Sequence, residues 1–136
     1  MTLEYAPPPA TSKGMLWTGR VISTLIILFM GGMGSFMLLV KFDFVKEQMA
    51  KQGFPAGAAV GILVAEIVSA ILYAIPQTAV LGAILLTGYL GGAIATHVHL
   101  GEPEKMAPAV VIGVLVWVAL WLRDPRVRDL APIRKM

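Results

Sequence analysis

Two apolar runs stand back to back in residues 56–99, AGAAVGILVAEIVSAILYAIPQTAVLGAILLTGYLGGAIATHVH, with only Pro76 and Gln77 between them. Each run supplies about 20 mostly apolar residues, the length that a helix needs to cross the hydrocarbon core of a bilayer. A connection this short makes consecutive helices antiparallel neighbours. The stretch therefore predicts a transmembrane helical hairpin, with helices over about 56–75 and 78–99.

Two further apolar runs flank this hairpin, at about 16–40 and about 108–122. The whole composition agrees with them, because 57% of the 136 residues are hydrophobic and only 14% are charged. An average soluble domain carries about 25% charged residues. A small soluble domain also leaves too much of its surface in water to hide so many apolar side chains. We therefore expect a single all-α membrane domain over residues 1–136, built as a four-transmembrane-helix bundle.

The polar segment 41–54 separates the first two predicted helices. Its apolar side chains are spaced as on one face of a helix, at Phe42, Val45, Met49 and Phe54. This spacing predicts a short amphipathic helix on the membrane surface. An ordinary solvated loop is the alternative.

The 11 basic residues divide unevenly between the two ends of the predicted bundle. The end that holds both termini has Lys13, Arg20, Arg123, Arg126, Arg128, Arg134 and Lys135, and the other has Lys41, Lys46, Lys51 and Lys105. By the positive-inside rule, both termini are expected in the cytoplasm. Residues 1–15 would then be a cytoplasmic tail and residues 123–136 a basic cytoplasmic tail. Arg20 is expected to extend to the headgroups rather than to pair with a deeper residue.

The chain contains no cysteine. This excludes disulfides, iron–sulfur clusters and thiol–disulfide exchange within the chain. Quinone, flavin, haem or partner-borne redox chemistry stays open. The sequence has no clear cofactor motif, and it predicts no metal site. A quinone or another lipophile remains a possible ligand. The basic residues near the ends are typical of membrane orientation, so nucleic acid is not an expected partner.

Small residues recur every fourth position in the second and third predicted helices, at Gly57 and Gly61 and at Gly88 and Gly92. Lipid exerts no hydrophobic force between helices, so small residues are needed where backbones approach closely. These four glycines are therefore predicted to mark helix-packing faces rather than a ligand site.

Glu66 lies near the middle of the second predicted helix, where an ionisable side chain is costly unless it is protonated, paired or hydrated. Ser69 and Tyr73 follow on the same helical face. Thr87 and Tyr89 fall at a similar depth on the third helix. These residues form a candidate intramembrane polar site. A neutral Glu66 that hydrogen-bonds across the bundle is the structural interpretation, and a proton relay or ligand contact is the functional one.

His97 and His99 extend this candidate site to the outer end of the third helix. On a continuous helix, side chains two residues apart point about 200° apart, so the pair is not expected to share a metal ion. The helical wheel places His99 on the face of Gly88 and Gly92 and therefore predicts that His99 points inward. Metal or haem ligation and a simple boundary position are both open for the two histidines.

The fourth helix ends in aromatic and basic side chains. Tryptophan is favoured in the headgroup zone, which is where we expect Trp117 and Trp121. The motif that follows, with Arg123, Arg126 and Arg128, predicts a topology anchor. Contact with anionic lipid or with a partner protein is the alternative.

Several segments together are similar to the DoxX-like family of small bacterial membrane proteins. They are the run from Glu66 to Pro76, the segments TAVLG (78–82) and LLTGYLGGAIATH (85–97), and the ending with Trp117, Trp121 and LRDPR (122–126). The likeness covers roughly Gly53 to Arg126. It implies a four-helix, multi-pass protein of the bacterial cytoplasmic (inner) membrane. It also implies a link to redox or oxidative-stress systems, because a namesake relative is a component of a thiosulfate:quinone oxidoreductase. The resemblance implies that the histidine typical of the family corresponds to His97, whereas the helical wheel favours His99 as the inward-facing histidine.

Three functions follow as hypotheses, and no catalytic residue is assigned. The main one is an accessory or structural subunit of a larger membrane complex, redox or energy-converting, with the lipid bilayer and other membrane subunits as partners. The alternative is a DoxX-like oxidoreductase component or a lipophile- or quinone-binding protein, whose site would use Glu66, Tyr89 and the histidines. A proton-coupled transporter is the third, although four helices without inverted repeats provide few means of alternating access.

Overall fold

The computed structural model describes residues 10–55 and 57–130, and every regular element in this part of the chain is helical. The elements are α1 (Lys13–Ile27), the π-helical turn η1 (Leu28–Gly32), α2 (Met33–Leu39), α3 (Phe42–Lys51), α4 (Ala58–Ala74), the 3-10 turn η2 (Pro76–Thr78), α5 (Ala79–His99), the 3-10 turn η3 (Pro103–Met106), α6 (Ala107–Arg123) and α7 (Pro125–Leu130). Most of the predicted N-terminal tail, the predicted helix start at Ala56, and Arg134 and Lys135 lie outside the described residues.

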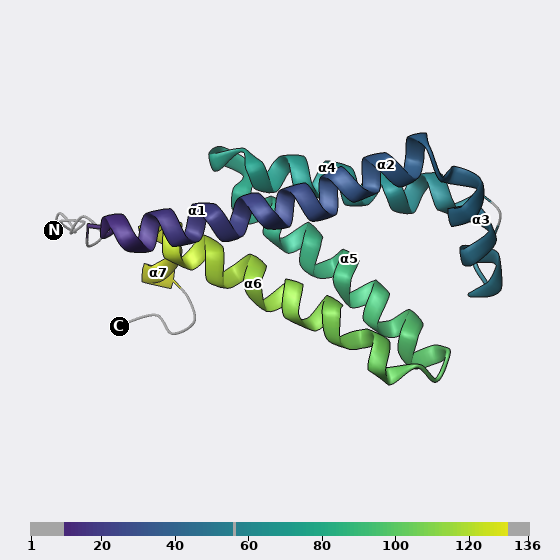
Figure 1. Ribbon diagram of the computed structural model, residues 1–136. Helices are drawn as coiled ribbons and strands as arrows, with labels where there is room; N and C mark the ends of the chain where they lie inside the picture. Colours follow the sequence, from purple (N-terminus) through teal and green to yellow (C-terminus); the bar gives the residue numbers. More distant parts are fainter. Residues whose placement is uncertain (1–9, 56, 131–136) are drawn as a thin grey trace, which may run out of the picture.

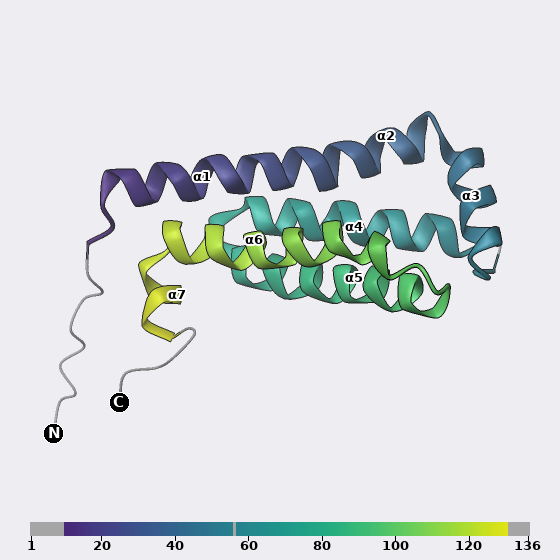
Figure 2. The same ribbon diagram turned by 60° about the horizontal axis from the view of Figure 1, so that its bottom comes forward.

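The first rod of the fold is α1, η1 and α2 in unbroken succession from Lys13 to Leu39 (Figure 2). It begins at Ser12, whose hydroxyl accepts a hydrogen bond from the backbone N–H of Met15 at 3.2 Å and so caps the first turn. Beyond Leu39 the chain turns sharply into α3, which lies across the end of the rod (Figure 2).

The chain then runs up and down. Figure 2 shows α4 returning beside the first rod, α5 running back, and α6 returning again, with α7 folded against the end of α6. The start of α1 and the end of α6 thus lie together at one end, called the terminal end here. The other end, with α3 and the α5–α6 turn, is called the α3 end. Gly101 makes that turn at a φ of +72°, a left-handed conformation that glycine adopts without a Cβ clash.

Three stretches of the described chain are long and apolar enough to cross a membrane: Lys13–Leu39, Pro76–His99 and Pro103–Arg123. α4 is a shorter apolar helix of 17 residues, about 26 Å long at 1.5 Å per residue. Large apolar side chains cover the outer surface, and Leu39 is 82% exposed. Such a surface suits lipid rather than water. The predicted all-helical membrane protein is confirmed to this extent.

The segment between α2 and α4 forms a helix, α3, as the apolar spacing suggests. Its predicted apolar residues, Phe42, Val45, Met49 and Phe54, are all partly buried. Its other face carries exposed pairs of opposite charge, Lys46 with Asp43 at 3.3 Å and Lys51 with Glu47 at 3.5 Å. α3 is therefore amphipathic, with its apolar face toward the bundle.

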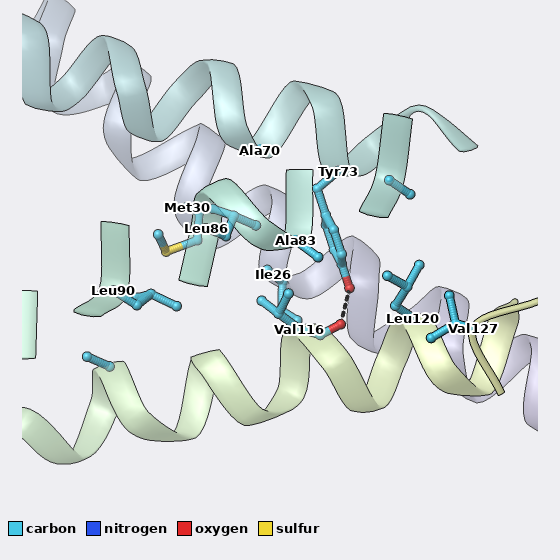
Figure 3. Close-up of a cluster of buried hydrophobic side chains, with 12 residues drawn as sticks. Ile26, Met30, Ala70, Tyr73, Ala83, Leu86, Leu90, Val116, Leu120 and Val127 are labelled. Atoms are coloured by element: carbon cyan, nitrogen blue, oxygen red, sulfur yellow. Dashed lines mark hydrogen bonds between the residues drawn. The ribbon is translucent and has the colours of Figure 1, made fainter. Parts of the chain in front are cut away.

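The tightest packing is at the terminal end, around Tyr73 (Figure 3). Tyr73 and Leu86 have no exposed surface, and Val116 and Leu120 pack beside them. The Tyr73 hydroxyl donates to the carbonyl oxygen of Val116 at 2.8 Å and so ties α4 to α6. Toward the α3 end, α5 and α6 diverge from α2 and α4 (Figure 1). The bundle is thus closed at one end and splayed at the other.

Close helix contacts depend on glycines other than the four predicted. A Cβ built at Gly82 would lie 2.5 Å from Cα of Tyr73, and one at Gly19 would lie 2.8 Å from the carbonyl oxygen of Ala119. By contrast, no described atom lies within 4 Å of a Cβ built at the predicted positions Gly57, Gly61, Gly88 and Gly92. No helix of the described chain packs on these four positions, because the spacing defines a face of small residues but not which helix meets it.

Replacing Tyr73 by phenylalanine is expected to destabilise the protein by about 1–2 kcal/mol. The ring stays, but the hydroxyl loses two buried interhelical hydrogen bonds, to the carbonyl oxygen of Val116 and to the Ser23 hydroxyl at 3.4 Å. Thermal unfolding in detergent measures this. Tyr89→Phe, which also removes one hydroxyl, is the comparison for a phenol that is only partly buried. Equal stability of Tyr73→Phe and the wild-type protein would contradict the role of the Tyr73–Val116 bond.

Candidate functional site

Glu66 and Tyr89 form a hydrogen-bonded pair between α4 and α5. The Tyr89 hydroxyl donates to Oε2 of Glu66 at 2.8 Å. Glu66 faces the bundle interior as predicted and is only 9% exposed. Thr87 and Tyr89 both lie at a depth where they could meet Glu66, and the residue that bonds to Glu66 is Tyr89. A carboxyl and a phenol in direct contact form a local path along which a proton can be exchanged.

Gly34 of α2 makes room for this carboxyl group. A Cβ at Gly34 would lie 3.3 Å from Cδ of Glu66 and 3.4 Å from its Oε2. The backbone of α2 thus covers the Glu66–Tyr89 pair from the side opposite α5. The π-helical turn η1 ends one residue before α2 begins, and π-turns within helices are frequent at functional sites. Together, α2, α4 and α5 enclose the pair.

A cavity of about 430 Å³ opens beside Tyr89 where the bundle splays. It lies between α3 and the start of α4 on one side and α5 on the other, at the α3 end. Its walls are Met49, Gln52, Phe54, Ile62, Gly88, Tyr89, Gly92, Ala93, Thr96 and His97. Most of these side chains are apolar, and four polar groups interrupt the surface. Gly88 and Gly92 therefore keep space open at this wall instead of packing helices together.

His97 lies at the cavity and His99 does not. Nδ1 of His97 is buried without a hydrogen-bond partner in the described part of the chain, whereas His99 is exposed. The helical wheel favours His99 and the family likeness His97, and the structure brings His97 to the cavity because the glycine face of α5 is not its buried face. The buried face of α5 carries Leu86 and Leu90 instead, and His97 shares that side.

Glu102 lies just outside the cavity beside His97. Its Oε2 is 3.6 Å from Nδ1 of His97, beyond hydrogen-bonding distance, and its Oε1 accepts from Nζ of Lys105 at 2.8 Å. The hydrogen bond from Lys105, with a smaller contribution from His97, holds the pKa of Glu102 below its usual range. An ionised carboxylate thus lies next to the imidazole at the cavity mouth.

The other members of the predicted polar site lie elsewhere. Ser69 is buried on the face of Glu66, but its hydroxyl donates to the carbonyl oxygen of Ala65 in its own helix. Tyr73 belongs to the terminal-end core. Thr87 accepts from Nε1 of Trp117 at 2.8 Å and so joins α5 to α6. The cavity therefore unites only Glu66, Tyr89 and His97 of the seven predicted residues, with Glu66 present through its bond to Tyr89.

The residues predicted to contact lipid or a partner also make contacts within the chain. Arg123 donates from Nη2 to the carbonyl oxygen of Tyr73 at 3.0 Å. Arg128 donates to the carbonyl oxygens of Trp121 and Leu122 at 2.9 and 3.1 Å, which caps the end of α6. Arg126 is exposed. Contact of these residues with lipid or a partner stays a prediction.

Sequence reasoning missed Gln52 and Gly34. Gln52 is one of the four polar residues of the cavity wall, and it follows directly after the amphipathic helix α3. Its position directly after a predicted amphipathic helix could have indicated that Gln52 faces the bundle. Gly34 belongs to a group of small residues in the first predicted helix, typical of close packing, but nothing in the sequence connects it with Glu66. In the part of the chain that the structure describes, no three His, Asp or Glu residues lie close enough together to hold a metal ion.

The fold and the outward apolar surface define a helical membrane protein with a polar pair and a cavity within the bundle. The sequence model of the DoxX-like family matches residues 21–119. The chain belongs to the DoxX-like family, and the resemblance seen in its sequence is confirmed. Searches of curated proteins and of solved structures returned no match.

Proposed function

We propose that this chain binds a lipophilic molecule with a polar head, of the quinone class, in the cavity at the α3 end. The observation that carries the proposal is the cavity itself, about 430 Å³ in volume, with an apolar wall and a few polar groups. Small-molecule sites have this size and this mixture of surfaces. Tyr89 lines the cavity and donates to Glu66 behind it, so the pair would give a bound head group a route for protons.

The donor set of the cavity fits a quinone head. A quinone carbonyl accepts hydrogen bonds, and His97 lines the cavity wall with an imidazole ring that can donate one. Tyr89 supplies a phenol at the same wall. A hydrogen bond from His97 would orient the head, because the Tyr89 hydroxyl already donates to Glu66. Met49, Phe54 and Ile62 would contact the apolar ring and tail. Reduction to the quinol also needs two electrons, and under this proposal a redox partner protein supplies them.

The need for a redox partner supports the role of a subunit in a larger membrane complex, redox or energy-converting, in the bacterial cytoplasmic membrane. We further propose that α4 is a fourth span, so that the chain is multi-pass with both termini in the cytoplasm. α4 is apolar and runs the same course as the three longer spans. The uneven distribution of basic residues supports the orientation. Gentle purification followed by mass spectrometry of co-purifying chains tests the subunit role.

Replacing His97 by leucine is expected to weaken quinone binding about fivefold, because one hydrogen bond worth about 1 kcal/mol is lost. The measurement is a titration of the detergent-purified protein with decylubiquinone, followed by quenching of its tryptophan fluorescence. His99→Leu is the matched control, since it makes the same change two residues away on an exposed position. We expect it to leave the affinity unchanged.

Two outcomes would contradict the quinone site. One is the absence of saturable quenching in the wild-type protein, which removes the ligand class. The other is an equal loss of affinity in His97→Leu and His99→Leu, which places the binding outside the cavity. Co-purification of partner chains is a separate result. A subunit that does not bind quinone would co-purify with partner chains but show no saturable quenching by decylubiquinone.

A further inference from the structure

Two arginines from different helices line a second cavity, at the terminal end of the bundle. It has a volume of about 260 Å³ and lies where α1, the α4–α5 connection and the end of α6 meet. Its walls are Leu16, Arg20, Pro76, Ala79, Leu120, Arg123 and Asp124. None of these residues lines the cavity at the α3 end. The two cavities therefore belong to opposite ends of the molecule.

The two guanidinium groups are held in different ways. Arg123 donates from Nη2 to the carbonyl oxygen of Tyr73 and lies over the Tyr73 ring, 4.8 Å from its centre. Its Nε is buried and has no hydrogen-bond partner within residues 10–55 and 57–130. Arg20 is exposed, with its guanidinium 5.9 Å from the centre of the Trp17 ring. Arg123 is thus fixed in place, whereas Arg20 is an exposed arginine at the wall of the same cavity.

The remaining polar elements of this cavity leave a net attraction for an anion. Asp124 contributes one negative charge, but its Oδ1 already accepts from the backbone N–H of Arg126 at 2.9 Å. Pro76 and Ala79 place the start of the α5 helical segment in the cavity wall. The N-terminus of a helix carries a partial positive charge and attracts anions. Two guanidinium groups and a helix N-terminus therefore oppose one engaged carboxylate.

We propose that this cavity binds a phosphate group, either in the headgroup of a phospholipid or as free phosphate. Guanidinium groups match phosphate oxygens in geometry as well as charge. The cavity lies at the ends of the helices, where lipid headgroups meet a membrane protein. This inference uses other residues than the quinone site and does not depend on it.

The test is the melting temperature of the protein in dodecyl maltoside, which contains no phosphorus, during titration with phosphatidylglycerol or with inorganic phosphate. A ligand that binds the folded protein raises the melting temperature in a saturable way. Arg20→Gln is expected to raise the half-saturating concentration about fivefold, the effect of one basic residue near anionic lipid. Arg126→Gln is the matched control, because it removes the same charge from the same end without touching the cavity wall.

Each outcome decides the proposal. Saturation with both phosphatidylglycerol and inorganic phosphate, weakened by Arg20→Gln alone, assigns a site for phosphate itself. Saturation with phosphatidylglycerol alone, weakened in the same selective way, assigns a headgroup site. Equal effects of Arg20→Gln and Arg126→Gln would overturn the proposal in favour of general surface attraction. Absence of any saturable rise in the wild-type protein would also overturn it.

Discussion

Gly82→Ala is expected to lower the melting temperature of the purified protein by about 10 °C, because the added methyl group meets backbone instead of a movable side chain. Its Cβ would lie 2.5 Å from Cα of Tyr73 and 2.7 Å from the carbonyl carbon of Leu72. Overpacking of this kind costs about 1–3 kcal/mol or more, and each kcal/mol shifts the melting temperature of a small domain by several degrees. The α4–α5 hairpin must open to relieve the contact.

Gly88→Ala is the control for this substitution, since it adds the same methyl group to the same helix, α5. No described atom lies within 4 Å of the Cβ position at Gly88. The melting temperature is expected to stay the same or to rise slightly, because alanine is the better helix former. A loss of stability in Gly88→Ala that matches the loss in Gly82→Ala would contradict the packing of α4 against α5 described above.

Gly92→Leu is expected to reduce quinone binding at least tenfold while the protein remains folded. The new side chain would enter the cavity at the α3 end, whose wall Gly92 forms together with Tyr89 and His97. No described atom lies within 4 Å of the Cβ position at Gly92, so the first carbon of the new side chain meets no clash. The measurements are the decylubiquinone titration for binding and the melting temperature for folding.

The neighbouring substitution, Gly91→Leu, separates occupation of the cavity from a general change in α5. Gly91 also has open space around its Cβ position, but it faces a different groove of about 510 Å³ between α5 and α6, near Gly113 and Trp117. We expect Gly91→Leu to bind quinone as the wild-type protein does. Wild-type affinity in Gly92→Leu would show that the ligand does not occupy the cavity.

The class of this protein could be predicted from its sequence, because transmembrane helices depend on local composition. A run of about 20 apolar residues satisfies its own backbone as a helix and is accepted by lipid whatever its neighbours are. The all-helical membrane class and the DoxX-like family follow from the residues alone. The inward orientation of Glu66 follows as well, because exposing that side chain to lipid is costly.

Only the tertiary structure decided which small residues pack and which polar residues meet. The spacing of Gly57, Gly61, Gly88 and Gly92 describes a helix face, but the crossing of α4 and α5 places Gly82 at the contact and leaves those four open. The depth of Glu66 allowed two partners, and the rotation of α5 selected Tyr89 over Thr87. The same rotation turned His97 to the cavity and His99 away.

These features depend on the angles and rotations of whole helices, which arise from the sum of many weak packing contacts along the bundle. A helical period fixes relative directions within one helix, whereas the choice of the face that meets a neighbour belongs to the assembled bundle. The sequence by itself therefore determined the helices, their family and their membrane environment. The tertiary structure decided the splay at the α3 end, and with it the cavity that the proposed function requires.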